Sequence, residues 1–157
     1  HSFPTRRSSD LQTSLKPFAV ENGSMVVPGV SGAALEIQAT LRLEPPAESG
    51  LRMKKAAAAG LRVRSSGDGL RGVEIRWDGA KLSVAGCSVD LPAEAGAELT
   101  LDVFLDKSLL EVFANGGRVA MTRIIYPPAE DLAIEVFSEQ GTTYVDRIDV
   151  WKMKGIW

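Results

Sequence analysis

Apolar and polar residues alternate with a period of two along much of this 157-residue chain. From Leu35 to Leu43 the odd positions are apolar, and the even positions are charged or polar. Successive side chains of a strand point to opposite faces of its sheet, so this pattern predicts a strand with one face in a core and the other in water. The same alternation recurs in four further segments, 61–63, 73–77, 82–84 and 99–105. Half-buried strands of this kind are typical of antiparallel sheets.

Turn-forming residues separate these segments. Asp78-Gly79 and Asn115-Gly116 favour the positive φ angles of tight hairpins, and Pro45-Pro46 and Pro127-Pro128 fix φ between elements. Roughly nine short strands at spacings near ten residues predict an all-β fold, an antiparallel β-sandwich of two packed sheets with jelly-roll or lectin-like architecture. The alanine-rich run 53–59 is too short for an independent helix, so we expect a connecting excursion with at most one helical turn.

Composition and charge exclude several classes of protein. The hydrophobic share of 45% and the charged share of 24% are ordinary globular values, and the length suits one domain. The net charge is −2, and the basic residues are scattered rather than gathered into the stripe that binds nucleic acid. No apolar run approaches the roughly 18 residues of a membrane-spanning helix. We therefore expect neither a nucleic-acid nor a membrane partner.

Residues 1–11 read HSFPTRRSSDL and look like the translation of a short-read sequencing adapter. We predict that this segment is a disordered artefact and that the fold occupies residues 12–157. His1, the only histidine, lies inside it. On this interpretation the chain begins within a longer bacterial gene, so the sequence leaves both a cytoplasmic and a secreted location open.

The remaining residues offer little catalytic chemistry. Without His1, a Ser-His-Asp or Cys-His catalytic group would lack its general base. Cys87 is the only cysteine and cannot form a cysteine metal site by itself, so we expect no metal or other cofactor. Asp106 and Glu111 are the candidate pair for a glycosidase, which needs two carboxyl groups about the scissile bond. Asp106-Lys107-Ser108 has turn composition, however, and an Asp in a turn usually caps its own backbone, so we favour a structural role.

Three other features have a structural and a functional interpretation. Trp77, Trp151 and Trp157 could stack against a sugar, but in a sandwich such side chains more often pack in the core or at an interface. Ser66-Gly67-Asp68-Gly69 lies between two predicted strands, so we expect a loop rather than a phosphate-binding turn before a helix. Cys87 is expected to be a small, buried or half-buried hydrophobe.

One long segment resembles a known family. The run LDVFLDKSLLEVFANGGR, residues 101–118, is similar to the C-terminal β-sandwich of glycoside hydrolase family 32, the invertases, levanases, inulinases and other fructosidases. Residues 122–127, TRIIYP, resemble its T-x-R-I-Y-P segment with one residue changed or inserted, and residues 150–157 resemble its closing strand. Segments 33–43 and 60–64 fit more weakly. The residues that carry this structural motif are Asp106, Ser108, Glu111, Phe113, Asn115, Gly117, Arg123, Tyr126, Pro127, Trp151 and Trp157.

The resemblance implies a supporting module rather than a catalytic one. The family places its Asp nucleophile, a second Asp and its Glu acid/base in an N-terminal five-bladed propeller, in N-D-P-N-G-like, R-D-P and E-C motifs, and this sequence contains none of the three. No catalytic residue is therefore carried over, and substrate-binding residues stay unknown. The implied parent hydrolyses terminal fructosyl bonds of sucrose, levan or inulin. The implied partners are that propeller and, in some relatives, a second subunit.

Two alternatives stay open. A stand-alone lectin-like sandwich would bind polysaccharide through exposed Trp or Tyr side chains. An immunoglobulin-like or legume-lectin-like interaction domain would make the similarity of residues 101–118 a coincidence.

Residues 85–89, AGCSV, also differ from the D-R-S-like segment that many members of family 32 carry at this place.

Overall fold

The computed structural model describes residues 7–44, 54–94 and 96–153. These ranges form eleven strands and no helix, and hence no helix that could cross a membrane. The strands are β1 (Arg7–Leu15), β2 (Phe18–Val26), β3 (Ala34–Arg42), β4 (Ala58–Ser65), β5 (Val73–Trp77), β6 (Lys81–Val84), β7 (Cys87–Asp90), β8 (Glu98–Asp106), β9 (Leu109–Ala114), β10 (Val119–Ile124) and β11 (Ala133–Met153).

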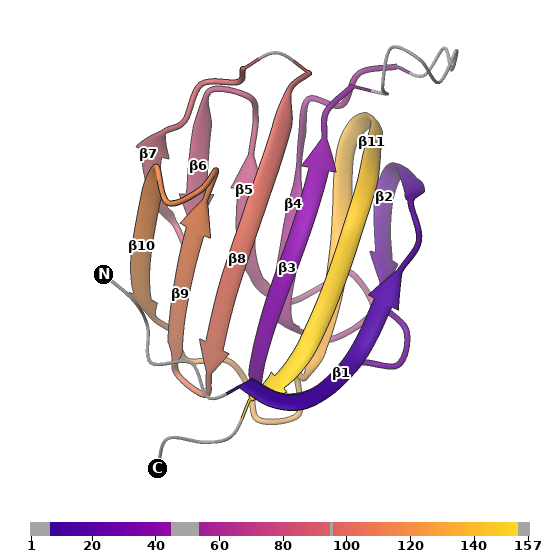
Figure 1. Cartoon of the computed structure of the whole chain (residues 1–157). Helices are drawn as coiled ribbons and strands as arrows, with labels where there is room; N and C mark the ends of the chain where they lie inside the picture. Colours follow the sequence, from indigo (N-terminus) through magenta and orange to yellow (C-terminus); the bar gives the residue numbers. More distant parts are fainter. Residues whose placement is uncertain (1–6, 45–53, 95, 154–157) are drawn as a thin grey trace.

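Two antiparallel layers share one long strand, β11, of 21 residues. Its second half pairs with β3, which continues through β8 and β9 to β10, and we call this layer, together with β1, the front sheet. Its first half pairs with β4, which continues through β5 and β6 to β7, and we call this layer the back sheet. Figure 1 shows β8 and β3 in front of β4 and β5. The prediction of an all-β antiparallel sandwich is confirmed.

A shared bend closes one side of the sandwich. β2 pairs with both halves of β11, and the register shifts between Ser138 and Thr142. Asn22 and Gln140 have positive φ angles at this bend, and the Gln140 amide donates a hydrogen bond to the Asn22 side-chain oxygen at 3.1 Å. A Cβ on Gly141 would lie 2.4 Å from the Lys55 carbonyl oxygen, so the chain needs glycine where the strand turns.

The core contains the apolar residues that the alternation predicts. Leu35, Ile37, Ala39 and Leu41 of β3 face it, and so do the alternate apolar residues of β8. Trp77 is fully buried and donates its indole N–H to the Leu91 carbonyl at 2.7 Å. Removal of these apolar surfaces from water is the main force that holds the two sheets together.

Two segments differ from the sequence-based expectation. Residues 7–11 belong to β1, so the expected disorder does not extend to them, although regular pairing with β11 begins only at Thr13. Residues 1–6 lie outside the described ranges, and the adapter origin stays a prediction. Ala58 and Ala59 form the start of β4 rather than part of a connection: both pair with β11, and both small side chains are buried.

Gly60 provides a test of this packing. A Cβ at this position would lie 1.8 Å from the Ile75 carbonyl oxygen, a backbone atom that cannot move away without separating β4 from β5. We expect Gly60→Ala to lower the free energy of unfolding by more than about 3 kcal/mol in urea titration. Gly23→Ala is the control, because its Cβ would make only an ordinary 3.4 Å contact. Equal stability of the two variants would contradict the close approach of β4 and β5.

Candidate functional site

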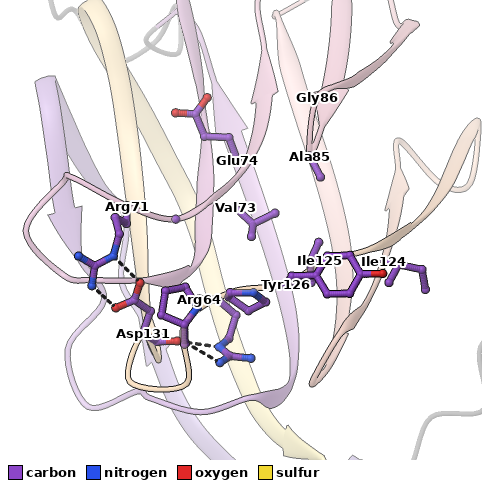
Figure 2. Close-up of a pocket in the computed structure, with 13 residues that line it drawn as sticks. Arg64, Arg71, Val73, Glu74, Ala85, Gly86, Ile124, Ile125, Tyr126 and Asp131 are labelled. Atoms are coloured by element: carbon purple, nitrogen blue, oxygen red, sulfur yellow. Dashed lines mark hydrogen bonds and ion pairs between the residues drawn. The ribbon is translucent and has the colours of Figure 1, made fainter.

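An open groove of about 500 Å³ lies where the end of β10 approaches the β6–β7 turn and the loop after β4 (Figure 2). Tyr126 and Pro127, two residues of the family motif, line it. Its other lining residues are Arg64, Arg71, Gly72, Val73, Glu74, Ala85, Gly86, Ile124, Ile125, Pro128 and Asp131.

Arg64 forms the floor of this groove and joins three loops. Its guanidinium donates hydrogen bonds to three backbone carbonyls, those of Asp131 at 2.6 Å, Pro128 at 3.0 Å and Lys107 at 3.3 Å. The side chain is buried, and its backbone has a positive φ of 47°. Because backbone oxygens accept the N–H groups of the guanidinium, Arg64 is a structural residue rather than an anion-binding one.

Arg71 and Asp131 form a bidentate ion pair at the rim. The two hydrogen bonds measure 2.8 and 2.7 Å, and Asp131 is 2% exposed whereas Arg71 is largely open to solvent. The hydrogen bonds from Arg71 and its positive charge hold the pKa of Asp131 below its ordinary value, and the same contact raises the pKa of Arg71. Such a carboxylate stays ionised and does not serve as a general acid near neutral pH.

The outer rim of the groove is aromatic and apolar. Tyr126 is 88% exposed, and Ile124 beside it is also exposed. Glu74 of the groove is engaged by Arg62 at 3.2 Å. The groove therefore offers a surface for stacking or apolar contact, and the two carboxylates that line it, Glu74 and Asp131, are each held by an arginine.

Asp106 and Glu111 lie elsewhere, on the outer face of the front sheet. Asp106 pairs with Leu109 and Glu111 pairs with Phe104 on neighbouring strands, so the two carboxyl groups lie side by side on one sheet face rather than on opposite sides of a cleft. A glycosidase pair must flank the bond that breaks. We expected the Asp106 side chain to accept hydrogen bonds from its own turn. Instead, the turn is held by the Lys107 amide, which donates to the Ala33 carbonyl at 2.7 Å.

Other motif residues shape the hairpins around β9. The Asn115 side-chain oxygen accepts the Thr100 amide at 2.9 Å, and the Asn115 amide donates to the Thr100 carbonyl at the same distance. Gly117 has a φ of 87°, which favours glycine. Ser108 acts through its carbonyl, which accepts the Ile125 amide at 2.8 Å. Phe113 packs edge to face against Phe104, with ring centroids 5.9 Å apart.

The tryptophans do not form a common platform among the described residues. Trp77 is in the core, Trp151 is half-buried on the outer face of the front sheet, and Trp157 lies outside the described ranges. Cys87 is exposed, which corrects the expectation of a buried or half-buried side chain, because it lies at the rim of the short edge strand β7. Arg123 donates to the Ala85 carbonyl at 3.0 Å and thereby joins β10 to the β6–β7 turn.

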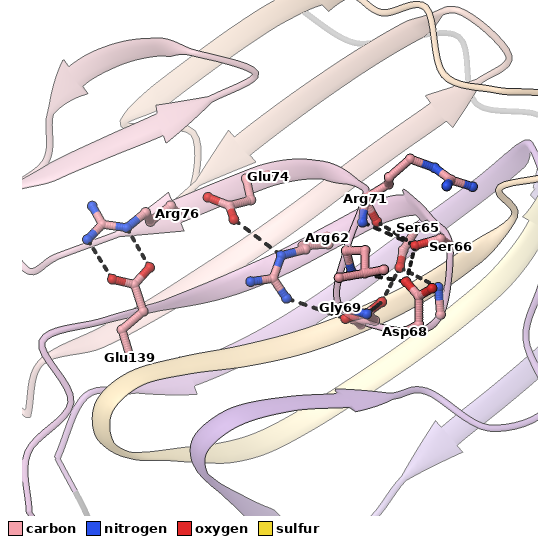
Figure 3. A network of polar contacts seen from close by, with 12 residues as sticks. Arg62, Ser65, Ser66, Asp68, Gly69, Arg71, Glu74, Arg76 and Glu139 are labelled. Atoms are coloured by element: carbon pink, nitrogen blue, oxygen red, sulfur yellow. Dashed lines mark hydrogen bonds and ion pairs between the residues drawn. The ribbon is translucent and has the colours of Figure 1, made fainter.

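The glycine loop after β4 belongs to a polar network on the back sheet (Figure 3). The Gly69 amide donates to the Glu135 carboxylate at 3.2 Å and the Leu70 amide donates to Asp68 at 3.0 Å, so the chain's own carboxylates occupy the donors that a phosphate would need. The hydrogen bonds from Ser66 and Leu70 lower the pKa of Asp68. Across residues 7–44, 54–94 and 96–153 there is no group of three His, Cys, Asp or Glu side chains that could hold a metal ion.

Comparison with known proteins gives the family of the chain. Residues 4–152 match the family model described as "Glycosyl hydrolases family 32 C terminal". The chain belongs to this family. The resemblance of residues 101–118 is therefore confirmed, and an unrelated immunoglobulin-like or legume-lectin-like domain is excluded. The family 32 match begins at residue 4, within the segment predicted to be adapter-derived.

The relatives are much longer than this family 32 chain. A levanase of Bacillus sp. strain L7 is 30% identical over 144 residues, which cover 87% of the chain and 16% of the levanase. A levanase of Bacillus subtilis strain 168 is 27% identical over 145 residues, 84% of the chain and 20% of that enzyme. The solved exo-inulinase of Aspergillus awamori superposes with a TM-score of 0.76 at 18% identity, over 96% of the chain and 31% of the enzyme. The chain thus spans only the C-terminal, non-catalytic part of such proteins.

The Arg71–Asp131 pair predicts an acid-dependent loss of stability. The pKa of Asp131 is lower in the folded state, so the pair stabilises the fold above the unfolded pKa of about 3.9 and this contribution is lost as the pH falls through the folded value. We expect Asp131→Asn to be less stable than the parent chain at pH 6 and to approach it below about pH 3.9. The measurement is urea unfolding across this pH range.

Glu130→Gln is the matched control for this test, because Glu130 is an exposed acid next to Asp131 in the same turn. We expect its stability to follow that of the parent chain throughout the range. A constant difference between Asp131→Asn and the parent from pH 6 to pH 3 would show that the ion pair is not the cause.

Proposed function

We propose that this chain is the supporting module of a longer enzyme that hydrolyses terminal β-fructofuranosyl bonds, as in sucrose, levan or inulin. In that enzyme an N-terminal five-bladed propeller would carry the catalytic carboxyl groups, and this sandwich would hold and stabilise it. The relatives are named as levanases and an exo-inulinase. We carry this activity over to the longer enzyme, not to the chain itself.

One observation carries this proposal. The family match covers nearly the whole chain, yet the chain accounts for a fifth or less of either levanase. The groups that break the bond are therefore expected in the rest of the parent. The described residues agree with this division. Asp106 and Glu111 share one sheet face, and the charged side chains of the groove are held by ion pairs or by backbone carbonyls.

A lectin-like function is the second candidate, and Tyr126 is the observation that favours it. Among the residues that the structure describes, this ring is the most exposed of the large hydrophobic side chains, and it lies on the rim of the groove (Figure 2). Exposed aromatic rings stack on apolar ligand faces. The groove would then bind a fructan chain for the parent enzyme.

Fructose release tests the supporting role. The 157-residue chain should release no fructose from sucrose, levan or inulin, whereas the protein encoded by the same gene extended upstream should release it. The control for contamination is a catalytically dead variant of the extended protein, purified in the same way. Turnover by the chain alone would contradict the proposal, and so would an upstream sequence without a propeller.

Isothermal titration calorimetry with levan and inulin separates the two candidate functions. A purely supporting module should give no saturable heat. If the lectin-like function holds, the parent chain should bind with saturation, and Tyr126→Ala should abolish that binding. Leu70→Ala, which removes an exposed apolar side chain outside the groove lining, should leave it unchanged. Saturable binding by the parent chain would therefore overturn the purely structural account.

A further inference from the structure

The chain has two asparagines, Asn22 and Asn115, and a glycine follows each of them. An Asn-Gly pair is prone to spontaneous loss of the side-chain amide, because glycine has no side chain to shield the next main-chain nitrogen. The structure gives the two pairs different surroundings. Asn22-Gly23 lies at the bend of β2, and Asn115-Gly116 lies in the turn after β9.

The first pair is exposed and weakly held. β2 pairs only with β11 among the described strands, and the register of the two strands breaks between Ser138 and Thr142, so Asn22 has no paired residue opposite it. Figure 1 shows β2 at the side of the sandwich next to β11. Both Asn22 and Gly23 are exposed. The contact recorded for the Asn22 side chain in the described part of the chain is the hydrogen bond from the Gln140 amide at 3.1 Å.

Solvent also reaches this pair. Asn22, Gly23 and Ser24 contribute to the lining of an open hollow of about 310 Å³ between β2, the loop after β4 and the first half of β11. The side of Gly23 where a Cβ would lie is open, since the Glu21 carbonyl oxygen would be 3.4 Å away from it. The Asn22 side chain therefore has room to rotate, and water has access to it.

The second pair is held at several points. The Asn115 side-chain oxygen accepts the Thr100 amide at 2.9 Å, and the Asn115 amide donates to the Thr100 carbonyl at the same distance. The Gly117 amide closes the turn on the Ala114 carbonyl at 3.2 Å, and Asn115 is half-buried. Rotation of the Asn115 side chain must break its bond to the neighbouring strand β8, which costs free energy.

We propose that Asn22 is a site of spontaneous deamidation in the folded chain and that Asn115 is protected by its contacts. The Gly23 main-chain nitrogen attacks Cγ of Asn22 and the bond from Cγ to Nδ2 breaks. Nδ2 leaves as ammonia with the proton of the Gly23 amide, and a succinimide ring remains. Water then opens the ring at either carbonyl carbon, so that position 22 becomes aspartate or isoaspartate. The inference is independent of the proposed function, because it concerns the sandwich alone.

Two Asp-Gly pairs, Asp68-Gly69 and Asp78-Gly79, have the spacing for the same ring closure. An ionised carboxylate reacts poorly in this step, because it has no good leaving group. Hydrogen bonds from Ser66 and the Leu70 amide lower the pKa of Asp68, and two backbone amides lower the pKa of Asp78. Both carboxyl groups are ionised near neutral pH, so we expect Asn22 to react first.

The reaction at position 22 changes the bend that joins the two sheets. The Asn22 side-chain oxygen accepts the Gln140 amide where β11 passes from one layer to the other. Aspartate keeps an acceptor oxygen at the same place. Isoaspartate instead carries the main chain through the side-chain carbon, which lengthens β2 and moves the acceptor away from Gln140. We therefore expect isoaspartate, rather than the added charge, to weaken the bend.

Peptide mass spectrometry of the aged chain tests the site. The 157-residue chain is incubated in warm, mildly alkaline buffer and digested at intervals. We expect the deamidated fraction to grow at least about tenfold faster at position 22 than at position 115, because Asn115 must first break its bonds to Thr100. In concentrated urea the two rates should approach each other. Equal rates in the folded chain, or a faster reaction at position 115, would contradict the inference.

Gly23→Ala is the matched control variant. The new methyl group shields the attacking nitrogen, and it makes only an ordinary contact, so the fold should be retained. We expect deamidation at position 22 to fall below detection over the same time course, with position 115 unchanged. An unchanged reaction at position 22 in this variant would show that the main-chain nitrogen of residue 23 is not the nucleophile, and it would overturn the proposed step.

The stability of the two products tests the effect on the bend. Anion exchange separates the deamidated chain by its added negative charge, and electron-transfer fragmentation identifies the isoaspartate fraction. Asn22→Asp supplies the same charge with an ordinary main chain. We expect the thermal midpoint of the isoaspartate fraction to lie at least about 2 °C below that of Asn22→Asp, which should stay close to the parent chain. Equal midpoints of the isoaspartate fraction and Asn22→Asp would contradict the effect on the bend.

Discussion

The pairing of β11 with both sheets is the constraint on which the rest of this structure depends. One strand of 21 residues contributes half its length to each layer, so neither sheet is complete without the other. The bend at Gln140 and Gly141 is possible because Asn22 bends β2 in parallel and because the position next to Lys55 carries no Cβ. Most tertiary contacts are long-range, and the sandwich behaves as one unit rather than as two stacked hairpins.

That unit presents two chemically different outer faces. On the outer face of the back sheet, Arg62 and Arg76 each pair with carboxylates of neighbouring strands. On the front sheet, carboxylates and an apolar cluster lie together without such compensation at Glu111 and Asp106. Asp106 and Glu111 of the family motif lie on one sheet face, so these acidic residues do not flank a cleft as a catalytic pair would.

The sequence predicted the local elements better than the contacts between them. The alternation from Leu35 to Leu43 identified β3 and its core face correctly, because side-chain period alone decides which residues a strand buries. The alternation predicted that Glu36 faces water, but the structure buries its side chain. Alternation separates the two faces of a strand but does not show what packs on each face. The bend that joins Asn22 to Gln140, and the ion pair between Arg71 and Asp131, connect residues far apart in the chain and leave no local signal.

If the supporting role holds, the sandwich is thermodynamically coupled to the catalytic domain of the proposed parent enzyme. Differential scanning calorimetry of the upstream-extended enzyme, with fructose-releasing activity measured on the same heated samples, tests it most directly. The account predicts one cooperative transition in which the sandwich unfolds together with the loss of activity. Two independent transitions, with full activity remaining after the sandwich has unfolded, would contradict it.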